Sequence, residues 1–243
     1  NHDMKRTLLG VLTPSSNTVL EPLTSAIVSD IADVSAHFAR FRVTQISRGA
    51  VADAQFEVEK QLAASDMLAD ARVDAIVWSG TAASWLGFDK DARLCEAINQ
   101  RTGIVAGSSV LAINELFAAV GAKTFGLVTP YTQDVQDGIV ANYAGIGLEC
   151  IGERHLDESR NFEFSNFSEE TIGEMIEAVA VDKPDAITIM CTNMRGARIA
   201  PHYEEKLGIP IFDSTSAAVW SALRLAGRNP ADIKGWGQLF EIP

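Results

Sequence analysis

The chain has 243 residues, of which 47% are hydrophobic, and a formal net charge of −12 from 32 acidic and 20 basic residues. This composition excludes a disordered or low-complexity chain and supplies a substantial core for one large or two small domains. The acidic balance argues against a nucleic-acid partner, because phosphates require clustered Lys and Arg, whereas backbone N–H groups can still bind a small carboxylate.

Short apolar segments alternate with longer helical patterns along the whole chain. Strands are predicted at 8–13, 34–41, 75–78, 104–106, 125–129, 149–153, 186–190 and 209–212, and helices at 21–31, 54–69, 89–100, 110–120, 133–144, 169–181 and 215–225. Strands separated by helices favour βαβ units and a mostly parallel sheet. The continuous apolar run at 75–78 is typical of a strand that is buried on both faces. The predicted fold class is therefore α/β.

Three sequence blocks occur twice and keep their order. Residues 10–14 (GVLTP) return as 126–130 (GLVTP), 74–81 (DAIVWSGT) as 185–192 (DAITIMCT), and 102–106 (TGIVA) as 207–211 (LGIPI). Buried strands resemble one another, so a single pair would mean little, but three ordered pairs favour an internal duplication. We predict two pseudo-symmetric α/β halves, 4–115 and 116–230, each with a four-stranded parallel sheet flanked by helices, followed by a tail at 231–243.

This arrangement predicts a site between the halves, because ligands bind beyond the carboxyl ends of parallel strands. After the first strand, Pro14 fixes φ, and Ser15 and Asn17 offer polar groups either to a helix N-terminus or to an anion. After the third strand, Gly80 permits close approach to the backbone and Thr81 offers a hydroxyl, although a simple tight turn is the alternative. No GxGxxG or phosphate-binding Gly-Lys-Ser/Thr motif follows any strand.

The second half places Cys191 at the position that corresponds to Gly80. A thiol between a buried strand and a helix N-terminus has a depressed pKa, so we expect a value below about 8.5, that of a free thiol. The alternative is a small buried hydrophobe, but the position within the repeat favours a functional role. Cys95 and Cys150 lack that context and are predicted to be structural.

The sequence lacks the patterns that mark a membrane segment, a secretory signal, a disulfide framework or a metal site. No apolar run approaches the ~20 residues that cross a bilayer, and the first residues lack a secretory signal core. The cysteines form no CxxC or Cys/His cluster, so no disulfide framework or metal site is predicted. We therefore expect a cytoplasmic protein without a membrane contact.

Four large apolar side chains are candidates for an apolar wall of the predicted site, although such residues are more often core: Trp78, Trp85, Phe88 and Met194.

Taken together, these blocks resemble the aspartate/glutamate racemase superfamily, in the branch that holds maleate cis-trans isomerases and arylmalonate decarboxylases. Residues 10–21 (GVLTPSSNTVLE) are most similar to the opening of the isomerases, and 129–135, 189–193 and 207–216 also match the branch. The resemblance implies two α/β halves with the active site between them, a small carboxylate substrate and no cofactor. The resemblance is also compatible with a homo-oligomer.

The resemblance also implies roles for single residues. Racemases and maleate isomerases carry one cysteine in each half; here the second is Cys191, and the first would fall at Gly80. Arylmalonate decarboxylases similarly carry glycine and then cysteine, and they hold a carboxylate and an enediolate with backbone and hydroxyl donors. The matching positions are Pro14, Ser15, Thr81, Ala82, Tyr131, Thr192 and Asn193, and Asn17 and Asn161 match carboxylate-binding asparagines of the isomerases. Ala82 replaces a hydroxyl residue that is typical of the decarboxylases.

The number of thiols discriminates between the possible reactions. Racemisation needs an acid and a base on opposite faces of the α-carbon, and isomerisation would require Cys191 alone to attack and to transfer the proton. Decarboxylation needs only donors for an enediolate and one thiol that protonates carbon. We therefore predict a cofactor-independent, single-cysteine enzyme that decarboxylates a substituted malonate. Cis-trans isomerisation of an unsaturated dicarboxylate and non-catalytic carboxylate binding remain alternatives.

Overall fold

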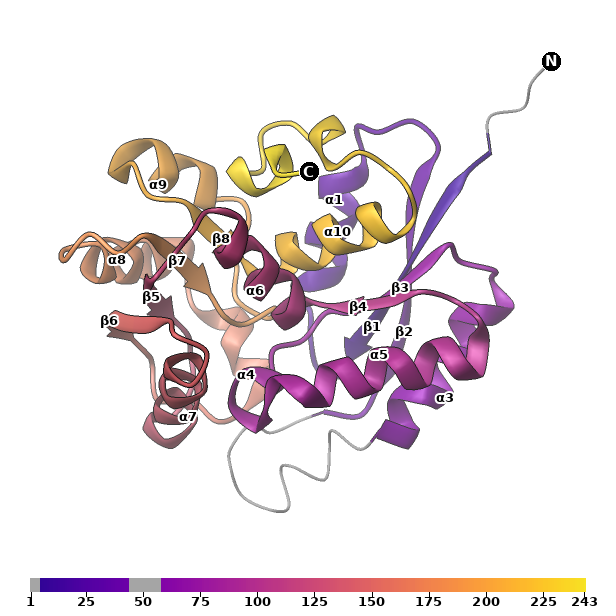
Figure 1. The fold of residues 1–243 in the computed structure, drawn as a ribbon, viewed down its shortest axis with the longest axis horizontal. Helices are drawn as coiled ribbons and strands as arrows, with labels where there is room; N and C mark the ends of the chain where they lie inside the picture. Colours follow the sequence, from indigo (N-terminus) through magenta and orange to yellow (C-terminus); the bar gives the residue numbers. More distant parts are fainter. Residues whose placement is uncertain (1–4, 44–57) are drawn as a thin grey trace.

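The computed structural model describes residues 5–43 and 58–243, and within them the strands form two parallel sheets of four strands each. The first sheet has the order β2-β1-β3-β4, with β1 (Thr7–Pro14), β2 (Val34–Phe41), β3 (Ala75–Trp78) and β4 (Ala106–Ser108). The second has the order β6-β5-β7-β8, with β5 (Thr124–Val128), β6 (Glu149–Arg154), β7 (Ala186–Ile189) and β8 (Ile211–Asp213). The two orders correspond strand for strand, which confirms the predicted pair of similar α/β halves (Figure 1).

Helices connect the strands and cover the sheets. They are α1 (Leu20–Val28), α3 (Val58–Asp70), α4 (Ala83–Leu86), α5 (Phe88–Thr102), α6 (Ser109–Ala119), α7 (Gln133–Ala144), α8 (Glu169–Val179), α9 (Ala200–Leu207) and α10 (Ser214–Leu225). The sequence did not predict α4, α9 or the short 3₁₀ turns at Asn161–Asn166, Pro230–Asp232 and Gln238–Glu241. The predicted helix start at 54–57 lies outside the described residues.

Two strands begin later than their apolar runs suggested. The backbone N–H of Ile104 donates to the Thr102 hydroxyl at 3.1 Å instead of joining the sheet, and β4 starts at Ala106. In the second half, Pro210 has no N–H to donate, and β8 starts at Ile211. The turn before each of these strands is as apolar as the strand itself, so the sequence does not mark where the strand begins.

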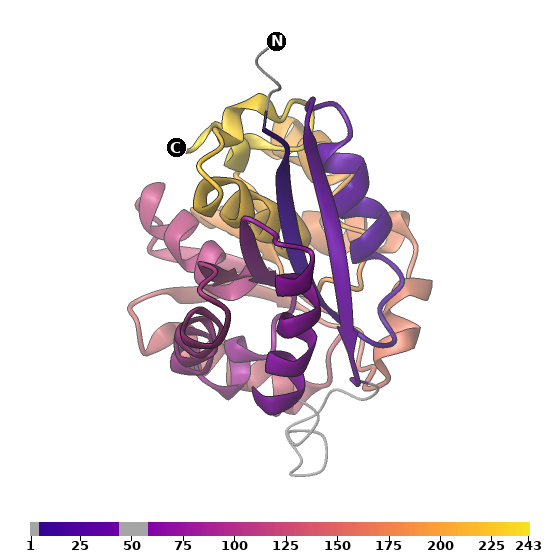
Figure 2. The ribbon, with the colours of Figure 1, turned by 90° about the vertical axis from the view of Figure 1, so that its right-hand side faces the viewer.

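The last helix of each half packs on the opposite half. Helix α10 follows β8 of the second sheet but contacts β3, β4 and α1 (Figure 2). Helix α6 follows β4 of the first sheet, and its Phe117 ring lies 5.5 Å from Phe125 and 5.8 Å from Phe212 of the second. Ser108 and Asp213, the last residues of β4 and β8, cap these helices by accepting backbone N–H bonds. The exchange fastens the halves to each other and holds their strand ends in a shared position.

The chain after α10 returns across the second half. The Glu204 carboxylate accepts the backbone N–H groups of Ile211 at 2.9 Å and of Gln238 at 3.0 Å. The Trp220 indole donates to the carbonyl of Ile242 at 2.8 Å. The bonds of Gln238 and Ile242 attach the C-terminal segment to α9 and α10, and the bond of Ile211 joins α9 to β8. The boundaries 4–115, 116–230 and 231–243 stay a prediction.

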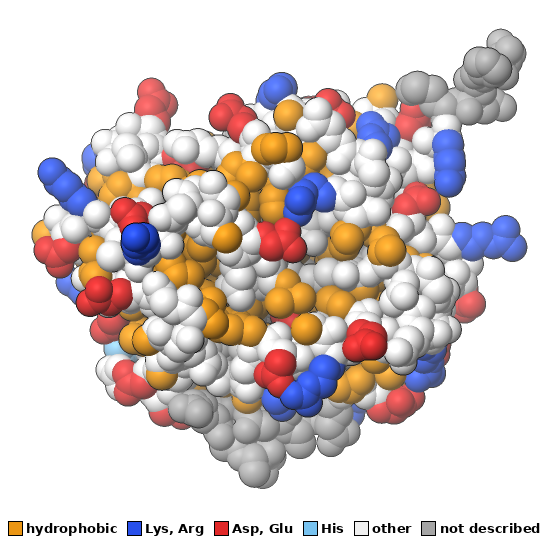
Figure 3. Space-filling model, in the orientation of Figure 1, with side chains coloured by type: hydrophobic (Ala, Val, Ile, Leu, Met, Phe, Trp, Pro, Cys, Tyr) orange, Lys and Arg blue, Asp and Glu red, His pale blue; other side chains and the backbone are white. Residues whose placement is uncertain are grey.

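The surface carries mixed charges. On the face shown in Figure 3, the described Lys and Arg side chains lie among Asp and Glu side chains, with apolar patches between them. No helix in the described ranges 5–43 and 58–243 is long and apolar enough to cross a membrane.

Helix α5 buries a carboxyl group, which leads to a prediction about stability. Asp91 is 3% exposed, and burial raises its pKa from 3.8 to about 7, opposed by a hydrogen bond with Ser108. Because the folded pKa is the higher one, the folded state binds more protons between pH 4 and 7, and stability falls as the pH rises through this window. We expect Asp91→Asn to raise the free energy of unfolding at pH 8 by about 2–4 kcal/mol and to leave it nearly unchanged at pH 4.

Urea unfolding of both proteins at several pH values measures this effect. Asp70→Asn, at the exposed end of α3, is the matched control and should preserve the slope of the wild-type protein. If Asp91→Asn also preserved that slope, the buried carboxyl would not be its source.

Candidate active site

A small pocket lies between the two halves at the carboxyl ends of their strands. It contains about 270 Å³ of empty space, and its walls are formed by Pro14, Val43, Trp78, Gly80, Thr81, Ala82, Trp85, Tyr131, Asn161, Cys191 and Thr192. These residues follow β1, β2, β3, β5 and β7 or lie near those strand ends, with Asn161 contributed by a 3₁₀ turn. Its small size and its mixed lining of aromatic, hydroxyl and amide groups suit a small ligand.

The structure brings most of the predicted site residues together. Those that line the pocket are Pro14, Gly80, Thr81, Ala82, Tyr131, Asn161, Cys191 and Thr192. Trp78 and Trp85 form part of its apolar wall, whereas Phe88 packs on Tyr143 at 4.9 Å. Sequence reasoning missed Val43, whose only signal was its position two residues beyond an edge strand.

Asn17 and Asn193 do not line the pocket, because their polar groups link the halves to each other. The Asn17 carbonyl oxygen accepts two backbone N–H groups at the start of α1, and its amide donates to the Thr192 hydroxyl at 3.2 Å. The Asn193 carbonyl oxygen accepts the N–H of Thr18 at 3.0 Å, and its amide donates to the carbonyl of Asn161 at 2.6 Å. These bonds position Thr192 and Asn161, which do line the pocket.

Ser15 also lies outside the pocket wall. Its hydroxyl accepts the N–H of Val43 at 2.9 Å and is 3.3 Å from the carbonyl oxygen of the same residue. Ser15 therefore holds the residue after β2 against the loop after β1, and through this bond it places Val43 in the wall.

Cys191 lies in a turn after β7, not at a helix N-terminus. Strand β7 ends at Ile189, and α9 begins only at Ala200. The thiol is 2% exposed, and burial raises its pKa from 9.0 to about 12, opposed by hydrogen bonds from the Asn193 N–H and the Tyr131 hydroxyl. The expected depressed pKa is wrong, because loss of water outweighs the donors of the turn. The thiol is consequently neutral near pH 7 and can act as an acid.

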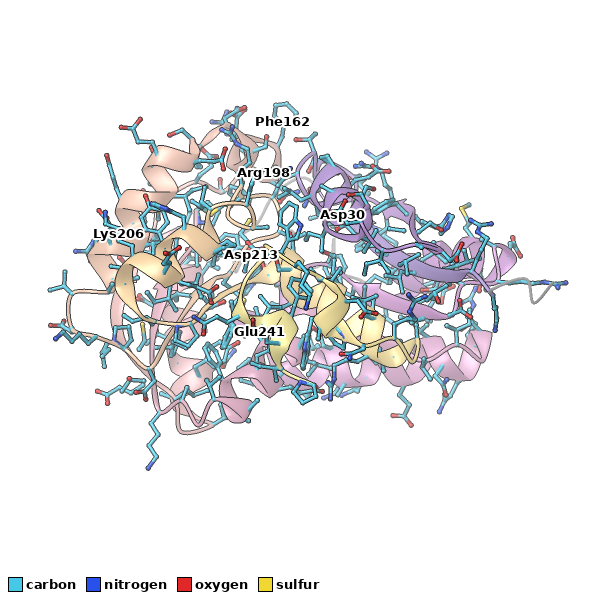
Figure 4. All side chains as sticks on the ribbon, turned by 90° about the horizontal axis from the view of Figure 1, so that it is seen from above. Asp30, Phe162, Arg198, Lys206, Asp213 and Glu241 are labelled. Atoms are coloured by element: carbon cyan, nitrogen blue, oxygen red, sulfur yellow. The ribbon has the colours of Figure 1, made fainter. Side chains whose placement is uncertain are left out.

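A buried carboxyl group lies behind this turn. Asp213 pairs with Ile189 across β7 and β8 and accepts the N–H of Ser216 at 2.9 Å, where the chain enters α10 (Figure 4). Burial raises its pKa from 3.8 to about 7. When it is ionised, the Asp213 charge adds to the effect of burial in raising the pKa of Cys191. It therefore helps to keep the thiol protonated.

Two hydroxyl groups lie together in the wall. The oxygens of Thr81 and Tyr131 are 2.5 Å apart, one from each half. The Tyr131 ring is held between Trp85, at 5.0 Å, and Phe164, at 5.4 Å. Burial raises the pKa of Tyr131 well above its usual value, so its hydroxyl remains a neutral donor. Preorganised donors of this kind stabilise an oxygen that becomes negative during a reaction.

The arrangement is suited to acid catalysis and anion binding by the protein's own groups. Among the described residues, no three His, Cys, Asp or Glu side chains lie together as metal ligands would. Cys191 is the only cysteine in the described pocket wall, since Cys95 lies in α5 and Cys150 in β6. The chemistry available is proton transfer by one thiol to a bound anion.

Comparison with known proteins identifies relatives along nearly the whole chain. A family model described as arylmalonate decarboxylase matches residues 9–240. The arylmalonate decarboxylase of Bordetella bronchiseptica is 27% identical over 153 residues, which cover 62% of this chain and 64% of that enzyme, less than two thirds of its length. The maleate isomerase of Nocardia farcinica is 25% identical over 241 residues, which cover 96% and 94% of the two chains.

Solved structures of maleate isomerase have the same fold as this chain. A cysteine-to-serine variant of the Nocardia farcinica maleate cis-trans isomerase, with a covalently bound succinylcysteine intermediate, superposes with a TM-score of 0.88 at 23% identity, covering 96% of this chain and 98% of that one. The resemblance seen in the sequence is thus confirmed, and the relatives are lyases and isomerases. Because the family model covers residues 9–240, the chain belongs to the arylmalonate decarboxylase family of enzymes.

Proposed function

We propose that this enzyme decarboxylates a substituted malonate and that Cys191 protonates the product. The observation that carries the proposal is a pocket in which one buried, neutral thiol is accompanied by a glycine and by the paired hydroxyls of Thr81 and Tyr131. A neutral thiol is an acid and not a nucleophile, because the thiolate is the nucleophilic form. One acid and several oxyanion donors are what decarboxylation with protonation requires.

The proposed reaction has two steps. The bond between the α-carbon and one carboxylate breaks, CO₂ leaves, and the electron pair enters the remaining carboxylate to form an enediolate. The hydroxyls of Thr81 and Tyr131 stabilise the charge that develops on its oxygens. Cys191 then transfers its proton to the α-carbon, and the resulting thiolate recovers a proton from water. The buried site favours this recovery, since burial disfavours the thiolate.

Cis-trans isomerisation of an unsaturated dicarboxylate is a second candidate. Asn161, which matches a carboxylate-binding asparagine of the isomerases, lines the pocket, and the match to the Nocardia farcinica isomerase extends along nearly the whole chain. A covalent succinylcysteine requires a nucleophilic thiolate, however. The raised pKa of Cys191 and the glycine at position 80 both make that step less favourable than decarboxylation.

Incubation with phenylmalonate and, separately, with maleate in D₂O distinguishes the two reactions by proton NMR. We expect phenylmalonate to yield phenylacetate with deuterium at the α-carbon and maleate to remain unchanged. Fumarate formed from maleate would support isomerisation instead, and no conversion of either acid would contradict both reactions. A cytoplasmic location and a homo-oligomer stay predictions.

A further inference from the structure

The Trp78 ring occupies the space that a side chain at position 80 would need. An ideal Cβ on Gly80 would lie 2.1 Å from Cζ2, 2.3 Å from Cη2 and 2.5 Å from Cε2 of Trp78, whereas real Cβ contacts are essentially never shorter than 3.0 Å. Trp78 is 1% exposed, and its ring lies 5.0 Å from the Phe41 ring. A side chain at position 80 therefore fits only if the Trp78 ring moves.

The same ring separates two cavities. Trp78 and Ala82 line the pocket that contains Cys191, and they also line a second cavity with about 570 Å³ of empty space. Other walls of the second cavity include Gln61, Leu86 and Leu94, from α3, α4 and α5. A smaller residue at position 78 would therefore enlarge the first pocket toward an existing space.

We propose that Trp78 is the specificity-determining residue of the pocket. Its indole stands where a first-half cysteine would project, so it restricts the enzyme to one thiol and limits the size of the substituent on the α-carbon. The size limit rests on the proposed decarboxylation, but the placement of the ring does not. One consequence is that Gly80→Cys alone does not supply a second working thiol, because residue 78 must first be made smaller.

A double-mutant cycle tests the packing without an activity assay. Gly80→Ala should lower the melting temperature of the wild-type protein by roughly 5 °C, since overpacking a core destabilises it. The same substitution should cost less than about 2 °C in a Trp78→Leu background, because the obstructing ring is gone. Trp78→Leu itself lowers stability, so each comparison is made within one background, and Trp78→Phe serves if the leucine variant does not fold.

Gly126→Ala is the matched control. A Cβ at Gly126 would meet Val179 at 3.0 Å. Gly126 lies in β5 of the second sheet, whereas Trp78 lies in β3 of the first. Gly126→Ala should therefore lower the melting temperature by the same amount in the wild-type protein and in the Trp78→Leu variant. Equal losses for Gly80→Ala in both backgrounds would overturn the proposed position of the ring.

Decarboxylation of malonates with increasing α-substituents, from methyl to naphthyl, tests the size limit. We expect the ratio of kcat/KM for the largest to that for the smallest substituent to rise at least tenfold in Trp78→Leu. An unchanged ratio in a variant that still decarboxylates malonates would overturn the proposal. No turnover of any malonate by the wild-type enzyme would contradict the proposed function instead, while coupling between positions 78 and 80 would still support the placement of Trp78.

Discussion

Replacement of Cys191 by alanine is expected to lower kcat for malonate decarboxylation by roughly 10²–10⁴-fold, the contribution typical of a positioned general acid. Cys191 is the only cysteine in the described pocket wall, and burial keeps its thiol protonated with a pKa of about 12. Without it, the enediolate must take its proton from water that reaches the pocket. Single-turnover release of CO₂, followed separately from proton uptake at carbon by NMR, measures which step is slowed.

Two control variants separate this effect from a change in folding. Cys95→Ala in α5 and Cys150→Ala in β6 remove half-buried thiols outside the pocket and should leave kcat unchanged. Cys191→Ser keeps a small polar group but offers a much weaker acid, so it should be nearly as slow as the alanine variant. Full turnover by Cys191→Ala, with an unfolding midpoint near that of the wild-type enzyme, would refute the catalytic role.

The second large effect is expected from Tyr131→Phe, which should lower kcat by about 10²–10³-fold, as removal of one oxyanion donor does elsewhere. The Tyr131 hydroxyl lies 2.5 Å from the Thr81 hydroxyl and hydrogen-bonds the Cys191 sulfur. Its loss removes a donor to the enediolate and a group that orients the thiol. Because these interactions strengthen as charge develops, kcat should change more than KM.

Tyr143→Phe is a closely matched control for this experiment. Tyr143 is also fully buried, and among the described residues its hydroxyl has no hydrogen-bond partner, but it lies outside the pocket wall. Removal of its hydroxyl should leave kcat unchanged and stability equal or slightly higher. If the two phenylalanine variants were equally active, the Tyr131 hydroxyl would have no part in the reaction.

The hydrophobic pattern of the sequence predicted a strand correctly where every residue of that strand is buried. Strand β3 (Ala75–Trp78) agrees with its prediction residue for residue because all four residues are buried between helices. The ends of β4 and β8 were misplaced because an apolar run does not reveal where backbone N–H groups are already used, as at Ile104, or missing, as at Pro210. Helix α9 was missed because it has only 8 residues and no capping side chain marks its start.

By itself, the amino-acid sequence determined the duplicated α/β plan, the strand ends that meet, and the pairing of Cys191 with Gly80, because these depend on periodicity and on order along the chain. Only the tertiary structure decided the properties that arise when distant segments enclose one another. The pKa of Cys191 follows from the loss of water around it, and Asn17 and Asn193 are bonded to residues far away in the chain. The Trp78 ring likewise fills the space beside Gly80 only because the packed core holds it there.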